Sequence, residues 1–243
     1  MFTEASRDQT LRALIQRAEA DPDVSGAVLY GSTASGAADR WSDLDMGMTV
    51  RDPAAVAERW TAALDPVHHW DLATGGGAFI RVFLLADGLE IDLGFFPEGG
   101  LVQRGAWRPV FGDFEESTAW KDSAPADPRL TIGMAWHHLL HVRVCIERGR
   151  LWQAEYWIGQ TRAHLIALVC LRFGLPTHYA KGAHLLPSDA SDALALVLAP
   201  TLVRSVDEAE LRRALSATID AFDAELRHHD PGLADRLKPI LNS

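Results

Sequence analysis

The sequence predicts an α/β (α+β) domain with a mixed sheet, followed by an all-α helical bundle. Three observations lead to this prediction. Strand and helix patterns alternate over the first hundred residues, only helical patterns follow residue 129, and an irregular segment rich in proline and aromatic residues separates the two regions. A length of 243 residues suits two small domains better than one. We therefore expect domains over residues 1–98 and 129–243, joined by a packed connector over residues 99–128.

The first domain is expected to begin with a helix over residues 7–20, because apolar residues recur there at helical spacing and Asp21-Pro22 ends the pattern. A second helix is expected over residues 53–64, where Asp52-Pro53 suits a capped first turn. Ala86-Asp87-Gly88 predicts a tight hairpin turn between the last two strands of the domain. Alternation and short apolar runs predict strands over residues 24–30, 43–50, 67–72, 79–85 and 89–96.

The second domain shows no strand pattern. Residues 165–171 are apolar on nearly all sides, so we expect them in a central helix that is buried by several neighbours. A last short helix should start at Asp230-Pro231. The other expected helices cover residues 130–149, 151–173, 191–198 and 207–228.

The composition excludes several classes of partner. The chain carries 23 Lys and Arg against 33 Asp and Glu, a formal charge of −10 that disfavours nucleic acid and anionic membranes and attracts cations. Cys145 and Cys170 lack the spacing of a zinc ribbon or a disulfide framework, which favours a cytoplasmic location. The first residues lack the pattern of a signal peptide, and no apolar run is long enough to cross a membrane. Both a monomer and a homodimer fit the sequence.

One stretch of the first domain combines a turn with paired carboxylates. Gly31-Ser32 follows the strand over residues 24–30, and a short helix is expected to lead from this turn to the next strand. Asp43 and Asp45 open that strand two residues apart, so both should project from the same face, as a shared divalent-ion site requires. Glu90 and Asp92 repeat this spacing on the strand over residues 89–96 and offer further carboxylates.

These motifs resemble those of the nucleotidyltransferase superfamily of the DNA polymerase β type. In that superfamily a Gly-Ser turn is followed about ten residues later by Asp-x-Asp, and a further acid lies on a neighbouring strand. The resemblance covers roughly residues 24–96. It implies that the backbone at Gly31 and Ser32 holds the triphosphate. It also implies that two Mg²⁺ ions are bound by Asp43, Asp45 and Asp92.

The order of an α/β domain before a helical bundle resembles the antibiotic nucleotidyltransferases for aminoglycosides and lincosamides. This resemblance implies transfer of a nucleoside monophosphate, AMP from ATP or the equivalent group of another NTP, to a hydroxyl of a small molecule. Such an acceptor can be a cationic antibiotic, and the activity would then confer antibiotic resistance. Lys181 resembles a lysine that these enzymes direct toward the triphosphate, and Arg162 would support it from the preceding helix.

The sequence leaves the general base open. A base must reach the acceptor hydroxyl, and a carboxylate that is bound to a metal is a poorer proton acceptor. Asp92 is predicted as the essential acid and Glu90, on the same strand face, as an assistant. Glu147 and Glu155 would take this role if the helical domain supplied the base.

Other patterns have a plainer interpretation. His137 and His141 share a helix face near His138 and His164, but no Cys, Asp or Glu lies at ligand spacing, which favours surface and packed histidines over zinc. Trp152, Tyr156 and Trp157 at helical spacing are more typical of a core than of a stacking site.

Two alternative functions remain at this point. One is a toxin-like transferase that acts on a protein or tRNA. The other is a non-catalytic nucleotide-binding module of the same fold.

Overall fold

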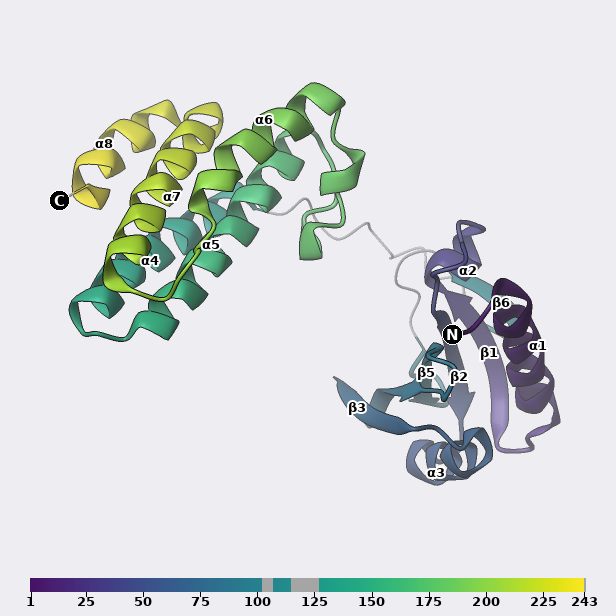
Figure 1. The fold of residues 1–243 in the computed structure, drawn as a ribbon. Coiled ribbons are helices and arrows are strands. Elements are labelled where there is room, and N and C mark those ends of the chain that lie inside the picture. The colour runs from purple at the N-terminus through teal and green to yellow at the C-terminus, as the bar shows by residue number, and fades with distance from the viewer. Residues whose placement is uncertain (102–106, 115–126, 243) are drawn as a thin grey trace. The chain divides into compact units, whose positions relative to one another are not determined.

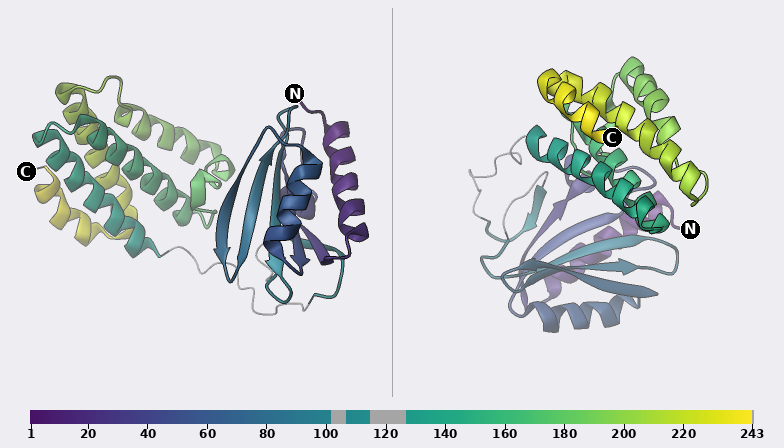
Figure 2. Two further views of the ribbon diagram at one scale, coloured as in Figure 1. Left: turned by 90° about the horizontal axis from the view of Figure 1, so that it is seen from below. Right: turned by 90° about the vertical axis from the view of Figure 1, so that its left-hand side faces the viewer.

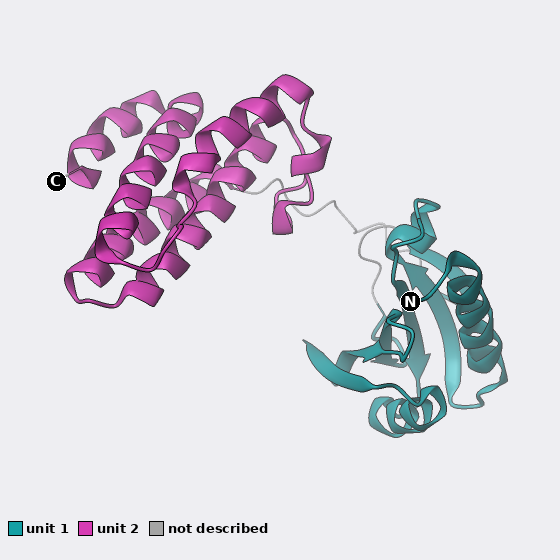
Figure 3. Ribbon diagram, in the orientation of Figure 1, with its two compact units in different colours: residues 1–122 teal, residues 123–243 magenta. Residues whose placement is uncertain are grey.

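The computed structural model describes residues 1–101, 107–114 and 127–242. The chain divides into two compact units, residues 1–122 and residues 123–243 (Figure 3). Each unit has its own hydrophobic core and is described by itself. Within the described ranges, no helix has both the length and the apolar character needed to cross a bilayer.

The first unit is built on a six-stranded mixed sheet with the strand order β3-β4-β5-β2-β1-β6 (Figure 1). Strands β2 and β5 run parallel, and every other neighbouring pair is antiparallel. The mixed α/β architecture predicted from the sequence is therefore confirmed. Its elements are α1 (Glu4–Ala20), β1 (Val24–Tyr30), α2 (Gly31–Ser35), β2 (Leu44–Val50), α3 (Pro53–Leu64), β3 (His68–Gly75), β4 (Ala78–Leu84), β5 (Glu90–Pro97) and β6 (Trp107–Phe111).

Helices α1 and α3 cover one face of this sheet (Figure 2). The helices cover this face because its side chains are apolar. Along β2, every second residue points to it, and Leu44, Met46 and Met48 are fully buried in the core that the helices share with the sheet. The residues between them, among them Asp45 and Gly47, project from the opposite face. The face without these helices is therefore the one that carries the acidic residues.

The predicted turns and caps of this unit are largely present. Asp52 accepts a hydrogen bond from the Ala55 backbone and caps α3, which starts at Pro53. The hairpin turn between β4 and β5 lies at Asp87-Gly88, as the sequence predicted. Strand β3 runs to residue 75, beyond the predicted end at residue 72, because it stays paired with β4 as far as the turn between them.

Strand β6 is an element that the sequence did not predict. It pairs with β1 at the edge of the sheet and lies inside the segment interpreted as an irregular connector. Pro109 within the strand hid the pattern, yet an edge strand tolerates a residue that cannot donate a ladder hydrogen bond.

The second unit is a helical bundle, as the sequence predicted. Its core joins α4, α5, α7 and α8 through buried residues such as Leu139, Ile158 and Phe222. The helix α5 carries the apolar stretch predicted to be central, and Leu165, Leu168 and Cys170 of that stretch are buried. The main helices are α4 (Pro128–Glu147), α5 (Leu151–Arg172), α6 (Ser188–Leu198), α7 (Glu208–His229) and α8 (Pro231–Leu241). Three short 3₁₀ helices add η1 (His178–Ala180), η2 (Ala183–Leu185) and η3 (Ala199–Thr201).

Candidate active site

The Gly-Ser turn lies directly against one of the predicted metal ligands. Strand β1 ends at Tyr30, and α2 starts at Gly31 with a φ of +58°. A Cβ atom added at Gly31 would lie 2.5 Å from Oδ2 of Asp45, so no side chain fits between this backbone and the carboxylate. The next residue, Ser32, has a buried hydroxyl oxygen with no hydrogen-bond partner among the described residues. The turn and the carboxylate thus form one continuous site.

The carboxylates of Asp45 and Asp92 lie side by side on neighbouring strands. The two residues are register partners in the parallel pair β2 and β5, on the sheet face opposite the helices. Asp43 lies directly before β2, and Glu90 is the exposed first residue of β5. The structure therefore brings the four predicted acids to one end of two adjacent strands.

This concentration of negative charge changes the acidity of Asp92. Burial raises the pKa of the Asp92 carboxyl to about 7, and repulsion from Asp45, Glu90 and Asp43 adds to the shift. Its oxygen Oδ1 is buried and accepts no hydrogen bond from the described residues. A carboxylate with a raised pKa and an unused oxygen is suited both to accepting a proton and to binding a cation.

The fit of these residues to a divalent cation can be tested on the same atoms. Hard cations such as Mg²⁺ take oxygen ligands, and Asp45 and Asp92 supply them in register. Across the residues that the structure describes, no three Asp, Glu, His or Cys side chains are already gathered around a single ion position. The chemistry of the donors and the unused oxygen of Asp92 fit a cation, while a third ligand such as Asp43 would have to turn toward it.

A cavity of about 290 Å³ opens beside these carboxylates on the same face of the sheet. Its lining is mainly apolar and comes from the hairpin of β3 and β4, from β2 and β5, and from the end of β1. Tyr30 and Phe96 form aromatic parts of this lining, and Asp45 and Asp92 are its acidic parts. A hydroxyl group on a molecule in this cavity would therefore meet the two carboxylates.

Two glycines allow these aromatic rings to lie on the sheet. A Cβ at Gly47 would come within 2.6 Å of the Tyr30 ring, and one at Gly94 within 2.4 Å of the Phe96 ring. Gly47 and Gly94 are register partners, so the two rings cover adjacent strands. Sequence reasoning missed Tyr30 and Phe96, although a glycine in a strand interior is a signal for close approach of another group.

Lys181 and Arg162, the residues predicted to contact the triphosphate, belong to the second unit. Lys181 is exposed and follows η1. Nη1 of Arg162 donates to the carbonyl of Thr201 at 2.9 Å and holds η3 against α5. The roles of both side chains toward a nucleotide stay predictions.

The two alternative bases of the helical unit differ in their surroundings. Glu147 is exposed and pairs with Arg212, with the atoms Oε1 and Nη2 2.9 Å apart. Glu155 is half-buried on α5. The raised pKa found for Asp92 has its cause in the first unit, where the acids lie close together.

The histidines of α4 and α5 form an aromatic cluster with Trp157. His138 is buried, and the centres of its ring and the Trp157 ring are 4.5 Å apart. His141 stacks on Trp157, with ring centres 5.4 Å apart, and its Nε2 lies 3.0 Å from Nε2 of His137. Burial and the neighbouring histidines lower the pKa of His138 to about 4. Trp157 packs as expected, whereas Trp152 and Tyr156 are exposed and the prediction of a core role for them is wrong.

Comparisons with known proteins find similarity among solved structures. No protein-family model and no curated protein matches the sequence. An aminoglycoside 6-adenyltransferase from Bacillus subtilis is 13% identical over 92% of this chain and 90% of its own, with a TM-score of 0.39. A nucleotidyltransferase-like protein from Exiguobacterium sibiricum is 16% identical over 90% of this chain and 75% of its own, with a TM-score of 0.40.

Proposed function

We propose that the protein is a Mg²⁺-dependent nucleotidyltransferase that moves a nucleoside monophosphate, AMP from ATP, to a hydroxyl of a small molecule. The observation that carries this proposal is the pair of Asp45 and Asp92, in register on parallel strands, with the Asp45 carboxylate against the backbone of Gly31. A turn without side-chain bulk beside paired acids suits a triphosphate and its metal ions.

Asp43, Asp45 and Ser32 would bind the ions and the nucleotide, and Asp92 would both bind an ion and accept a proton. Asp43 and Asp45, with one oxygen of Asp92, would hold the ions. Bound Mg²⁺ supplies charge neutralisation for the triphosphate and for the leaving group. The buried hydroxyl of Ser32 can donate to a phosphate oxygen, since it has no partner among the described residues.

The transfer itself needs one proton acceptor. The acceptor hydroxyl gives its proton to the Asp92 carboxylate, and its oxygen forms a bond to the α-phosphorus. The bond between this phosphorus and the bridging oxygen to the β-phosphate breaks, and pyrophosphate leaves with that electron pair. In the site without ions, burial and the neighbouring acids raise the pKa of Asp92. Bound Mg²⁺ would lower that pKa again, so the proton goes to the Asp92 oxygen that the ions leave free.

The acids also favour a cationic acceptor. Four carboxyl groups lie at this end of the sheet, and the chain as a whole has a formal charge of −10. A positively charged small molecule would be drawn to such a surface, and an anionic polymer would be repelled. An aminoglycoside, with amines and hydroxyls, is one compound of this class.

The proposal is tested by incubating the protein with Mg²⁺, α-labelled ATP and a panel of hydroxyl compounds that includes aminoglycosides and lincosamides. We expect labelled product of the mass of an AMP ester, together with pyrophosphate. Calorimetry with Mg²⁺ and a non-hydrolysable ATP analogue tests the nucleotide site without an acceptor. Nucleotide binding that is equal with and without Mg²⁺, and equal in wild type and Asp45→Asn, would refute the proposal.

A further inference from the structure

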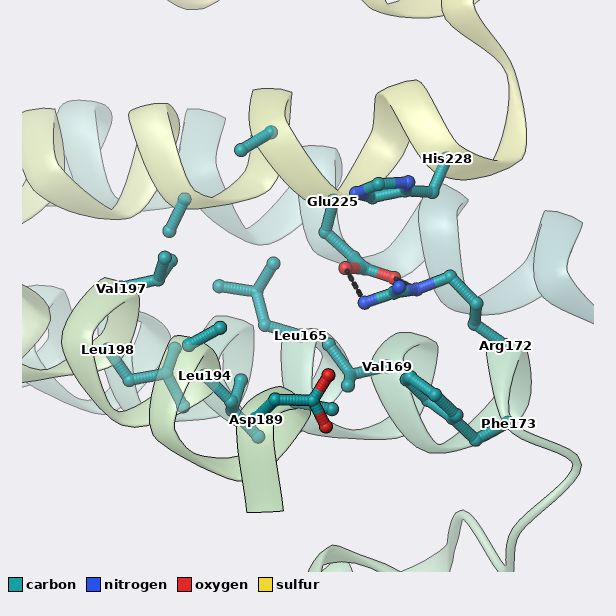
Figure 4. Close-up of a pocket in the computed structure, with 14 residues that line it drawn as sticks. Leu165, Val169, Arg172, Phe173, Asp189, Leu194, Val197, Leu198, Glu225 and His228 are labelled. Carbon is teal, nitrogen blue, oxygen red and sulfur yellow. Dashed lines mark hydrogen bonds and ion pairs between the residues drawn. The ribbon is translucent and has the colours of Figure 1, made fainter. Parts of the chain in front are cut away.

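A separate cavity of about 310 Å³ lies within the second unit between α5, α6 and α7 (Figure 4). Most of the side chains around it are apolar, and the charged ones gather on one part of its wall. Its volume lies at the lower end of the range for small-molecule pockets, roughly 300–1,000 Å³. The proposed transfer reaction makes no use of this cavity.

The apolar part of the wall comes largely from α6. Ala190, Ala193, Leu194 and Val197 follow one another at helical spacing and line the cavity. Every residue of α6, a helix that the structure describes in full, is partly or fully exposed. A helix of a water-soluble domain is normally held in place by burying its apolar stripe. The stripe of α6 instead faces open space that a ligand could fill.

The polar end of the cavity is built around a buried carboxylate. Glu225 of α7 is only 8% exposed and pairs with Arg172, with Nε and Oε1 3.2 Å apart. His229 approaches the same Oε1 at 3.1 Å. In Figure 4, Glu225, Arg172 and His228 lie at one end of the cavity, and Val197 and Leu198 lie at the other. The cavity is therefore amphipathic along its length.

The charges at the polar end favour a cation. Arg172 and His228 line the cavity together with Asp189 and Glu225. Glu225 is already paired with Arg172 and with His229, whereas Asp189 has no ion-pair partner among the described residues. The last turns of α5 and α7 add partial negative charge here, and the first turn of α6 adds partial positive charge. The lining therefore keeps one uncompensated negative charge, at Asp189, which favours a cationic ligand over an anionic one.

We infer that this cavity binds a small organic ammonium ion with an apolar body. The ammonium group lies beside Asp189, and the apolar body extends along the stripe of α6 toward Val197 and Leu198. The cavity is formed by residues of the second unit alone. The inference therefore stands or fails independently of the nucleotidyltransferase proposal.

The test uses the full-length protein and three probes that share one alkyl chain. n-Octylammonium, n-octanol and octanoate are titrated by calorimetry at concentrations below their aggregation thresholds. We expect one octylammonium ion to bind per chain, at least tenfold more tightly than octanoate, with octanol between them. Ethanolammonium, which has the charge without the apolar body, should not bind measurably.

Two variants of α6 form a matched pair for this test. Ala193→Trp places a large side chain in the cavity and should abolish octylammonium binding. Leu196→Trp adds similar bulk to a position of α6 that is 77% exposed and outside the cavity lining, and should leave binding unchanged. Asp189→Asn should reduce the preference for octylammonium over octanoate. Circular dichroism and thermal unfolding establish that each variant is folded.

Three results would overturn the inference. They are octanoate binding as tightly as octylammonium, octylammonium binding that survives Ala193→Trp in a folded protein, and no binding of octylammonium at millimolar concentration. If Ala193→Trp does not fold, Ala224→Leu places a larger side chain in the same cavity from α7. Loss of octylammonium binding in this variant supports the inference, and unchanged binding overturns it. Transfer activity plays no part in any of these outcomes.

Discussion

Asp92 and Glu90 lie two residues apart on β5, yet their surroundings assign them different roles. Asp92 has a buried oxygen without a partner among the described residues and a pKa raised to about 7, whereas Glu90 is exposed at the start of the strand. We expect Asp92→Asn to lower turnover by several orders of magnitude, because it removes both a proton acceptor and a metal ligand. We expect Glu90→Gln to lower turnover by about tenfold or less, because the exposed Glu90 carboxylate affects the site only through its charge on Asp92.

Single-turnover transfer from labelled ATP measures both effects. Glu98→Gln, an exposed acid at the end of β5 outside the cavity lining, is the matched control and should turn over like wild type. If Asp92→Asn stays active while Glu147→Gln or Glu155→Gln is inactive, the base belongs to the helical unit.

Gly31 offers a test of the contact between the turn and the acids. Gly31→Ala would push a Cβ atom into the Asp45 carboxylate, which must then leave its present position. We expect the affinity for the Mg²⁺ complex of an ATP analogue to fall at least tenfold. Gly36→Ala is the control, because Gly36 also has a positive φ and an added Cβ there meets no atom of the described residues within 4 Å. Equal affinities of the two variants in calorimetry would argue against this contact.

For β5 the sequence was sufficient to predict which acids share a face, because strand parity places Glu90 with Asp92. Asp43 was expected to open the strand with Asp45, but β2 starts at Leu44, so strand parity does not place Asp43. The sequence could not predict that Tyr30 and Phe96 would cover Gly47 and Gly94. That contact depends on the register between β2 and β5, which is set by tertiary pairing.

Strand β6 shows what the periodicity of apolar residues cannot detect. The strand is short and contains Pro109, and its backbone hydrogen-bond partners belong to β1, which is distant in the sequence. The longer helices and the hairpin at Asp87-Gly88 were predictable because their caps and turns depend on neighbouring residues. Helix α6 starts at residue 188, three residues before the predicted start. Its first turn has no side-chain cap, so the sequence carried no capping signal from which to predict this boundary.

The attachment of β6 can be tested at Gly112. An added Cβ would lie 2.6 Å from Cα of Gly26 and 2.8 Å from the carbonyl oxygen of Ser25, so backbone atoms of β1 would have to move. We expect Gly112→Ala to reduce the free energy of unfolding by about 3 kcal/mol or more. Gly36→Ala, which carries only the strain of a positive φ, should cost about 1–2 kcal/mol. Equal losses in urea unfolding would mean that β6 does not pack tightly against β1.

The chain consists of two units with separate cores. The change from alternating to purely helical patterns was enough to predict two such regions. The boundary at residue 98 rested on the loss of a strand pattern, and β6 continues the sheet of the first unit beyond it. Periodicity therefore identified the two regions, but pairing between distant segments decides where the sheet ends.

The two units are expected to respond to pH in opposite directions. In the first unit the folded state raises the pKa of Asp92 from 3.8 to about 7, so it binds more protons than the unfolded state between these values. Its stability therefore decreases as pH rises from 5 to 7.5. In the second unit the pKa of His138 is lowered from 6.5 to about 4 by burial and neighbouring histidines. The folded state of this unit therefore binds fewer protons than the unfolded state between pH 6.5 and 4. Its free energy of unfolding is fully present above pH 6.5 and decreases as pH falls toward 4.

Thermal unfolding of the full chain in EDTA, followed at pH 5 and pH 7.5, would measure these opposite trends. The lower pH should stabilise the first unit by on the order of 1 kcal/mol, since solvent screens part of the repulsion around Asp92, and destabilise the second by about 2 kcal/mol. Asp92→Asn should flatten only the first trend and His138→Gln only the second. Adding Mg²⁺ at pH 7.5 should restore stability to the first unit alone, because a cation offsets the repulsion that protonation relieves at pH 5. Parallel trends in both units, unchanged by either variant, would show that other groups control the pH response.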